Sequence, residues 1–260
     1  LYTVTGTDAK GCSATDTITI KLSSPPTAAI TTTALGYCVG GSGITLTAQA
    51  VPGATCQWYK NGTSQGAANT TNTFANATAG NWTVKVAIGT CADSLKTAIQ
   101  VVANPLPNAN ATSRATALCL NDTVSLKGAS TTSGVTYAWD NGIMNNSPIT
   151  LDNASKFKTY TLTVTSKENC KATTSVTLTQ KAASKITTNP TGFTACVGEN
   201  KTLTIAATGA GTLTYQWYLG PSTVGTNSAT LNLNNIQTSS AGTYKVSVTG
   251  DCGTLNSTDA

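Results

Sequence analysis

Hydrophobic and polar residues alternate with a period of two along most of the chain. Segments such as "ITLTA", "YTLTVT" and "YKVSV" show the alternation clearly, and Gly, Pro, Asn or Asp interrupt it about every 8 to 12 residues. No segment repeats its apolar positions with the helical period of 3.6. The pattern therefore predicts an all-β protein made of short strands and tight turns.

One pair of strands recurs four times. In each copy an aromatic residue opens an alternating strand and a cysteine follows the turn, as in "YTVTGTDAKGC" and "YTLTVTSKENC". The spacing between these cysteines is 79, 79 and 82 residues, which indicates an internal repeat of about 80 residues. The aromatic residues are Tyr2, Trp82, Tyr160 and Tyr244, and the cysteines are Cys12, Cys91, Cys170 and Cys252.

A second cysteine marks the start of each of the three longer copies. A tryptophan follows it after 20, 20 and 21 residues, in the pairs Cys38 and Trp58, Cys119 and Trp139, and Cys196 and Trp217. Segments rich in Pro and Ser separate the copies, because Pro cannot continue a central strand. We therefore predict a C-terminal hairpin of a truncated repeat in residues 1–22, and repeats in 23–104, 105–182 and 183–260, the last with a truncated final strand.

The recurring aromatic residues predict the fold of each repeat. A tryptophan on the third strand and an aromatic residue at the start of the sixth are typical of the core of an immunoglobulin-like β-sandwich. We expect tandem immunoglobulin-like domains of about 80 residues, arranged as an elongated rod. The predicted core aromatic residues are Trp58, Trp139, Trp217, Trp82, Tyr160 and Tyr244.

Charge and composition argue against several functions. The formal net charge is +5, but the fifteen basic residues are scattered and all except Arg114 are lysines, so no nucleic-acid partner is expected. The chain has no histidine, and its ten carboxylates are dispersed. We therefore expect no enzyme activity, catalytic residue, cofactor or metal site. No apolar run approaches the length of a membrane span, so no membrane insertion by this segment is expected.

Eight cysteines at repeating positions indicate disulfides and an oxidising, extracellular location. Pairing within repeats would join Cys38 to Cys91, Cys119 to Cys170 and Cys196 to Cys252. In an immunoglobulin-like sandwich these positions lie at opposite ends, roughly 25 Å apart, whereas a disulfide needs Cα atoms within about 7 Å.

Pairing between successive repeats is therefore the preferred alternative. It joins Cys38 to Cys170 and Cys119 to Cys252, across separations of 132 and 133 residues. Three cysteines are then expected to pair outside the fragment: Cys12, Cys91 and Cys196. Cys56 aligns with Tyr137 and Tyr215 on the inward face, so it is predicted to be a buried free thiol.

The motifs "YTVTGTDAKGCSATDTITI" and "CVG…TLT", with the tryptophan strand, resemble the tandem immunoglobulin-like or PKD-like repeats of giant surface adhesins of gliding bacteria, which the type IX secretion system exports. The resemblance covers the whole chain. It implies a gliding-motility adhesin at the cell surface, attached to the outer membrane. It also implies O-glycosylation at Asp-Ser/Thr-hydrophobic triplets, with Thr17, Ser94 and Thr123 as acceptors.

Three functions remain open at this point. The first is a structural stalk in a cell-surface adhesin that mediates attachment and gliding motility. Its partners would be neighbouring repeats of the same chain, with the motility and secretion machinery and external surfaces or polysaccharide contacted through other regions. The second is direct carbohydrate or surface binding by these domains, for which Tyr59 and Tyr218 are the repeated candidates and Asp140 breaks the series. The third is an accessory module of a secreted hydrolase.

Overall fold

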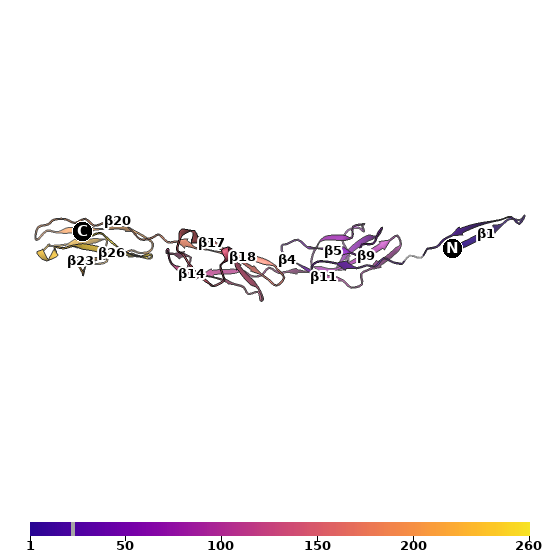
Figure 1. Ribbon diagram of the computed structural model, residues 1–260, viewed down its shortest axis with the longest axis horizontal. Helices are drawn as coiled ribbons and strands as arrows, with labels where there is room; N and C mark the ends of the chain where they lie inside the picture. The colour runs from indigo at the N-terminus through magenta and orange to yellow at the C-terminus, as the bar shows by residue number, and fades with distance from the viewer. Residues whose placement is uncertain (22–23) are drawn as a thin grey trace. The chain divides into compact units, whose positions relative to one another are not determined.

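The computed structural model describes residues 1–21 and 24–260, and almost all regular structure in these ranges is β (Figure 1). The predicted boundary between residues 22 and 23 lies outside the described residues. The helices of the described ranges are three single 3₁₀ turns: η1 (Asp140–Gly142), η2 (Ala154–Lys156) and η3 (Thr238–Ser240). None of the helices described is long and apolar enough to cross a membrane.

The chain forms two compact units. Unit 1 contains residues 1–106 together with 167–170, and unit 2 contains 107–166 and 171–260. Unit 1 has one cluster of buried hydrophobic side chains, and unit 2 has two. These are called the first, second and third cores below.

An isolated hairpin begins unit 1. Its strands β1 (Tyr2–Thr7) and β2 (Ser13–Ile18) pair antiparallel, with Tyr2 opposite Ile18. Every residue of both strands is exposed, and Tyr2 is 65% exposed. Its apolar residues therefore lack the covering sheet that buries the equivalent side chains of the later hairpins.

Two sheets enclose the first core. The smaller has the order β3-β5-β8, and the larger has the order β4-β11-β9-β6-β7 with β10 also paired to β9. All neighbours are antiparallel except β4 and β11, which are parallel. The strands are β3 (Ile30–Thr31), β4 (Gly36–Cys38), β5 (Ile44–Ala48), β6 (Thr55–Lys60), β7 (Thr63–Ser64), β8 (Thr73–Ala77), β9 (Gly80–Ile88), β10 (Cys91–Ser94) and β11 (Ile99–Asn104).

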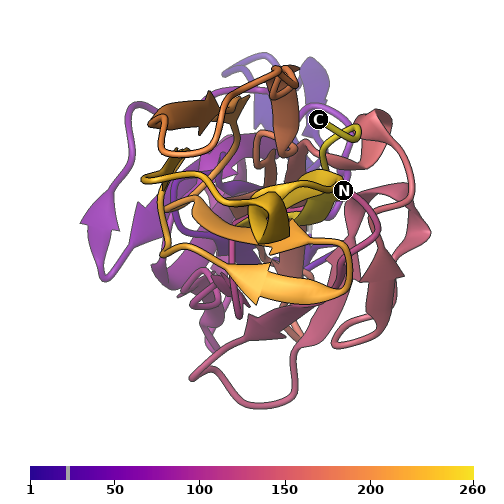
Figure 2. The same cartoon turned by 90° about the vertical axis from the view of Figure 1, so that its left-hand side faces the viewer.

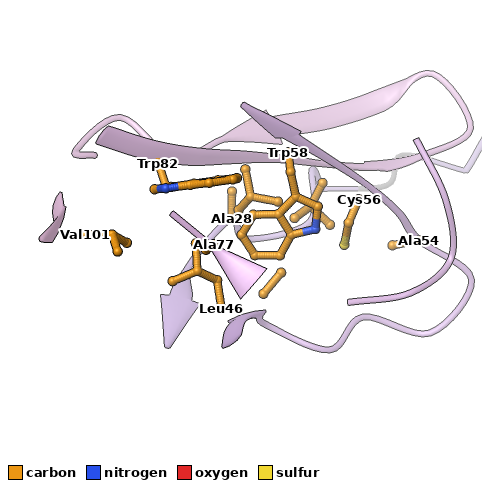
Figure 3. Close-up of a cluster of buried hydrophobic side chains, with 11 residues drawn as sticks. Ala28, Leu46, Ala54, Cys56, Trp58, Ala77, Trp82 and Val101 are labelled. Atoms are coloured by element: carbon orange, nitrogen blue, oxygen red, sulfur yellow. The ribbon is translucent and has the colours of Figure 1, made fainter. Parts of the chain in front are cut away.

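Alternation along the strands builds this core. In β9 the residues Trp82, Val84 and Val86 are buried, and the intervening positions are more exposed. In Figure 3, Trp58 and Trp82 point from one sheet toward Leu46 from the other. The Phe74 ring completes the aromatic packing, with its centroid 4.7 Å from that of Trp82 and 6.0 Å from that of Trp58.

The second core has the same strand order. Its sheets are β12-β14-β16 and β15-β17-β18, and a short parallel pair joins β13 to β19. Trp139, Tyr160 and Leu162 are central among its buried residues. The strands are β12 (Asn110–Ser113), β13 (Ala117–Leu118), β14 (Thr123–Ala129), β15 (Thr136–Trp139), β16 (Pro148–Thr150), β17 (Thr159–Thr165), β18 (Lys171–Thr177) and β19 (Thr179–Gln180).

The third core is enclosed by β20-β22, β21-β25 and the four-stranded sheet β24-β23-β26-β27 (Figure 2). Trp217 and Val246 are fully buried in it. The strands are β20 (Lys185–Thr188), β21 (Lys201–Thr204), β22 (Ala206–Thr208), β23 (Thr214–Leu219), β24 (Ser222–Val224), β25 (Thr230–Leu233), β26 (Tyr244–Gly250) and β27 (Gly253–Asn256).

The aromatic residue at the start of the sixth strand makes the same hydrogen bond in all three cores. The hydroxyls of Tyr160 and Tyr244 donate to the backbone carbonyl four residues upstream, each at 2.8 Å. In the first core the indole N–H of Trp82 does the same, also at 2.8 Å. This is the tyrosine corner of immunoglobulin-like sandwiches, here made once by a tryptophan. The strand order and this corner define each core as an immunoglobulin-like β-sandwich.

Candidate functional site: the disulfides between successive repeats

The structure has two disulfides, and each joins the cysteine at the start of one repeat to the hairpin cysteine of the next. Cys38 is bonded to Cys170 across 132 residues, with a Cα–Cα distance of 5.4 Å. Cys119 is bonded to Cys252 across 133 residues, also with a Cα–Cα distance of 5.4 Å. These are the pairs that the repeat spacing favours.

The first disulfide lies beside the parallel pair of strands in unit 1. Cys38 is the last residue of β4 and pairs with Asn104 of β11. The backbone N–H of Val39 donates to the Asn104 carbonyl at 2.9 Å, and the Sγ of Cys170 lies 3.9 Å from the same oxygen. Cys170 itself is fully buried. The disulfide is therefore packed against backbone on one side and is not exposed to solvent at Cys170.

The turn before Cys170 positions its side chain. Asn169 has φ +61°, in the left-handed region that Asn tolerates better than most residues. This turn connects β17 to β18, yet residues 167–170 belong to unit 1. The hairpin that carries Cys170 is thus shared: its strands build the second core and its tip is part of unit 1.

The second disulfide lies within unit 2, at the equivalent position of the next repeat. The backbone N–H of Cys119 donates to the Asp122 carboxylate at 2.8 Å. The backbone N–H of Asp251 donates to the Ala210 carbonyl at 3.0 Å, which fixes the tip of the hairpin that carries Cys252. Gly211 has φ +78°, which residues with side chains rarely adopt, and a β-carbon there would also displace the Asp251 carboxylate.

An ion pair accompanies the second disulfide. The Lys181 Nζ lies 2.8 Å from the Asp251 Oδ2, and the two side chains are 32% and 42% exposed. Pairs at this exposure contribute about 0 to 1 kcal/mol because water screens them. Lys181 follows β19, and its backbone N–H donates to the Leu118 carbonyl at 2.8 Å. The segment between the second and third cores is therefore held by an ion pair to the hairpin tip that carries Cys252.

The remaining four cysteines have free thiols in this structure. Cys12 and Cys196 are exposed, Cys91 is half-buried and Cys56 is buried. Burial raises the pKa of the Cys56 thiol, so this group is poorly ionised near neutral pH. Cys56 lies among the residues of the first core, where it takes the place of a small hydrophobic side chain.

The other predicted residues have clear places in the structure. All six core aromatic residues are buried: Trp58, Trp82, Trp139, Tyr160, Trp217 and Tyr244. The three O-glycosylation candidates are exposed: Thr17 in β2, Ser94 at the end of β10 and Thr123 at the start of β14. The two aromatic residues considered for surface binding, Tyr59 and Tyr218, are half-buried, and Asp140 is exposed.

One polar contact of unit 1 has no signal in the sequence. The Asp93 carboxylate accepts a hydrogen bond from the backbone N–H of Ala28 at 3.0 Å, across 65 residues. Hydrogen bonds from the backbone of Ala28 and then Ser94 lower the pKa of this carboxyl group. Asp93 therefore fixes the entry of the chain into the first core, a role that no local pattern could indicate.

Within residues 1–21 and 24–260 no group of three or more His, Cys, Asp or Glu side chains is placed to hold a metal ion. What the arrangement does chemically is to cross-link successive repeats.

Comparisons with known proteins give resemblances at the level of the fold. Titin domains I67–I69, in an E-to-A mutated variant, align with a TM-score of 0.45 at 13% identity, covering 91% of this chain and 97% of that one. The three N-terminal domains of the bacteriophage RB49 Hoc protein align with a TM-score of 0.43 at 18% identity, covering 90% and 96%. Extracellular domains 3–5 of Drosophila OTK align with a TM-score of 0.38 at 14% identity, covering 91% and 97%.

No protein-family model and no curated protein sequence matches the chain. The class of the protein rests on its own topology: three sandwiches in succession, each with the tryptophan on the third strand and the aromatic corner on the sixth. The chain is an all-β protein of tandem immunoglobulin-like repeats, as the sequence predicts.

Proposed function

We propose that this chain is a stalk segment of a large secreted adhesin at a bacterial cell surface, outside the outer membrane, where it serves surface attachment and gliding motility. In this proposal it has no catalytic activity and no cofactor. Neighbouring repeats are its direct partners, and other regions of the protein contact external surfaces or polysaccharide and the motility and secretion machinery. The observation that carries the proposal is the repeated disulfide from each repeat to the next.

The physical reason is mechanical. Contacts between domains of one chain are usually small enough to allow relative motion, so a run of repeats joined only by linkers bends easily. A covalent bond between successive repeats adds a second connection at each junction and restricts that motion. Disulfides of this kind persist in oxidising compartments, which supports an extracellular location.

The same repeat frame assigns the other cysteines. In this proposal Cys196 bonds the hairpin cysteine of a following repeat, while Cys12 and Cys91 bond the opening cysteines of preceding repeats. Supporting this, Cys196 and Cys12 are exposed and Cys91 is half-buried. The exposed hydroxyls of Thr17, Ser94 and Thr123 are then the proposed O-glycosylation sites, which the intact mass of the secreted protein would reveal.

A disulfide map of unreduced protein tests the proposal. Trypsin places six of the eight cysteines on separate peptides and leaves Cys38 and Cys56 together on one peptide. The stalk proposal expects two cross-linked peptide pairs, Cys38 with Cys170 and Cys119 with Cys252. Finding Cys38 joined to Cys91 and Cys119 joined to Cys170 would contradict it, because the repeats would then be connected only by their linkers.

A binding assay separates the stalk from the alternative of direct surface binding. The purified chain is passed over immobilised polysaccharides of several classes, with a Tyr59→Ala and Tyr218→Ala double variant as the matched control. The stalk proposal expects no saturable binding by either protein. Saturable binding that the double variant loses would favour carbohydrate recognition by these domains.

A further inference from the structure

The third strand of the sandwich is paired at its outer edge in two of the three cores. In the first core this strand is β6, and its outer edge is paired with β7 and, through a bridge from Cys56, with Asn69. In the third core the strand is β23, and its outer edge is paired with β24. In the second core the strand is β15, which lies at the end of its sheet and pairs with β17 alone among the described strands. The backbone of residues 135–139 on this side is called the β15 edge below.

A short connection leaves the β15 edge open. The next strand of the facing sheet, β16, begins 9 residues after Trp139, whereas β8 and β25 begin 15 and 13 residues after Trp58 and Trp217. The difference corresponds to the residues that form β7 and β24 in the other two cores. In the second core η1 follows β15 directly, so the chain crosses to β16 without a further strand. The open edge therefore depends on residues 139–148, in the middle of the chain.

The first core identifies the backbone groups that point to this edge. The N–H of Cys56 donates to the Asn69 carbonyl at 2.7 Å, and the N–H of Asn69 donates to the Cys56 carbonyl at 3.1 Å. The N–H of Gln65 donates to the Trp58 carbonyl at 2.9 Å. Cys56 and Trp58 thus direct their backbone groups away from β9 and toward the outer edge, as alternate residues of a strand do.

Tyr137 and Trp139 take the same places in β15. Tyr137 faces β17 in the same register as Cys56 faces β9. In the third core the equivalent N–H, that of Tyr215, donates to the Asn227 side chain at 2.7 Å. Among the described residues the N–H and carbonyl of Tyr137 have no partner on this side of β15. The second core therefore presents groups that the other two cores satisfy internally.

The side chains of the β15 edge do not protect it from pairing. Natural proteins guard open edges with Lys, with Pro or with a bulge. Residues 135–139 are Val-Thr-Tyr-Ala-Trp, which include no charged residue and no proline, and their register with β17 is regular. On the outer face of the sheet Ala138 is exposed, and its neighbours on β17 and β18 are Thr163 and Thr173. The edge is thus uncharged and suited to pairing with a further strand.

A second copy of this chain presents a strand that fits the edge. When two β15 strands pair antiparallel about a two-fold axis, Tyr137 lies opposite Tyr137 of the partner subunit. Each residue then donates its N–H to the carbonyl of the other, which is the reciprocal pair that Cys56 and Asn69 form in the first core. In the same register Val135 lies opposite Trp139 of the partner subunit, so further edge-facing groups are brought together.

The opposed side chains are compatible with this pairing. Tyr137 is half-buried beside the second core, and its ring meets that of the partner subunit across the axis, where aromatic pairs stabilise antiparallel strands. Asp140 is the charged residue nearest to the edge along the chain, and in this register it lies opposite Gly134, which is uncharged. Like charges therefore do not oppose each other along the paired strands.

We propose that two copies of this chain associate through the β15 edge, in an antiparallel pairing centred on Tyr137 that joins their two sheets into one. This is strand addition between identical subunits. Because the strand is short and buries little surface, the association is weak and depends on protein concentration. The inference goes beyond the proposed stalk and rests on the second core alone, so the disulfide map and the association can fail separately.

Hydrogen exchange at two protein concentrations tests the pairing. The exposed thiols of Cys12 and Cys196 are first alkylated with iodoacetamide, so that they do not cross-link the copies. Exchange of the Tyr137 amide is then measured by NMR at about 10 µM and about 1 mM protein. The internal control is the amide of Ser175, an exposed residue of β18 at the opposite end of the same sheet.

The expected result is that exchange of the Tyr137 amide slows at least about threefold at the higher concentration, while that of Ser175 does not change. No slowing at Tyr137 would overturn the proposal, because its edge would be free at both concentrations. Equal slowing at both residues would overturn it as well, because the association would not be specific to the β15 edge.

A pair of proline variants gives a second measurement. Tyr137→Pro removes the central donor of the β15 edge, and Ser175→Pro makes the same change in β18. Sedimentation equilibrium at about 1 mM should show the dimer in the unchanged chain and in the Ser175 variant, and a monomer in the Tyr137 variant. Protection of the Leu162 and Val164 amides checks that the second core of each variant is folded. A folded Tyr137→Pro variant that still dimerises would overturn the proposal.

Discussion

Removing the disulfide between Cys38 and Cys170 gives the sharpest test of how these repeats are stabilised. The change is the double substitution Cys38→Ala and Cys170→Ala. Alanine is chosen because Cys170 is fully buried, and a serine hydroxyl there would add the cost of burying a polar group. We expect the free energy of unfolding of the second core, whose hairpin carries Cys170, to fall by a large amount.

The magnitude follows from the length of the loop. For the 132 residues between the two cysteines, the chain-entropy model gives about 5 kcal/mol at 25 °C. If the first core stays folded while the second opens, the free loop shortens to the 66 residues between Asn104 and Cys170. The value then falls only to about 4 kcal/mol, because loop entropy depends on the logarithm of length. Either way of unfolding predicts nearly the same loss.

Native-state hydrogen exchange measures this loss core by core. The amides of Leu162 and Val164 lie in fully buried positions of β17 and report on opening of the second core. A loss of 4 to 5 kcal/mol corresponds to exchange about a thousandfold faster or more. The second double variant, Cys119→Ala with Cys252→Ala, removes a disulfide that closes an almost equal loop of 133 residues and should cause an equal loss in the third core.

The control is Cys196→Ala, which removes an exposed free thiol and should leave exchange in the second and third cores unchanged. Acceleration of less than about tenfold in the Cys38 and Cys170 variant would refute the entropic reasoning. Clearly different losses in unfolding free energy for the two disulfide variants would also refute the reasoning, because the two loops are nearly equal in length.

Three further predictions concern single side chains. The buried indole N–H of Trp58 has no hydrogen-bond partner among the described residues, whereas that of Trp217 donates to a backbone carbonyl at 2.9 Å. We therefore expect Trp217→Phe to lower the free energy of unfolding by about 2 to 4 kcal/mol, and Trp58→Phe to lower it by at least about 1 kcal/mol less. Urea denaturation of the two variants measures the difference. The lowered pKa of Asp93 means that its carboxylate stabilises unit 1 above the ordinary carboxyl pKa of about 4, and that this contribution is lost as the pH falls through the lowered value. Asp93→Asn should therefore lower the thermal midpoint at pH 7, by an amount that shrinks as the pH falls through the lowered pKa of Asp93, and an effect that stays constant with pH would contradict the assignment. Maleimide should label Cys196 in the native protein within minutes and Cys56 only after unfolding, as mass spectrometry would show, because Cys56 is buried and its raised pKa leaves little thiolate.

Much of the fold could be predicted because the sequence repeats itself. Each landmark appears three or four times, so a tryptophan such as Trp217 is placed on the third strand by comparison with Trp58 and Trp139. The pairing of Cys38 with Cys170 could be favoured over Cys38 with Cys91 because strand direction and strand length alone put the second pair too far apart. These arguments need only the period of the chain and the geometry of a strand.

The contacts that the sequence could not reveal join residues far apart without any repeated signal. Lys181 and Asp251 are 70 residues apart, and the bond between Asp93 and Ala28 spans 65.

The disulfide between Cys38 and Cys170 also has a consequence for the order in which the chain is oxidised. Its two cysteines are 132 residues apart, and Cys56, Cys91 and Cys119 lie between them in the sequence. The bond that the structure contains therefore requires the hairpin of the next repeat to be in place beside Cys38. Correct oxidation at this junction thus reports that two successive repeats have folded together.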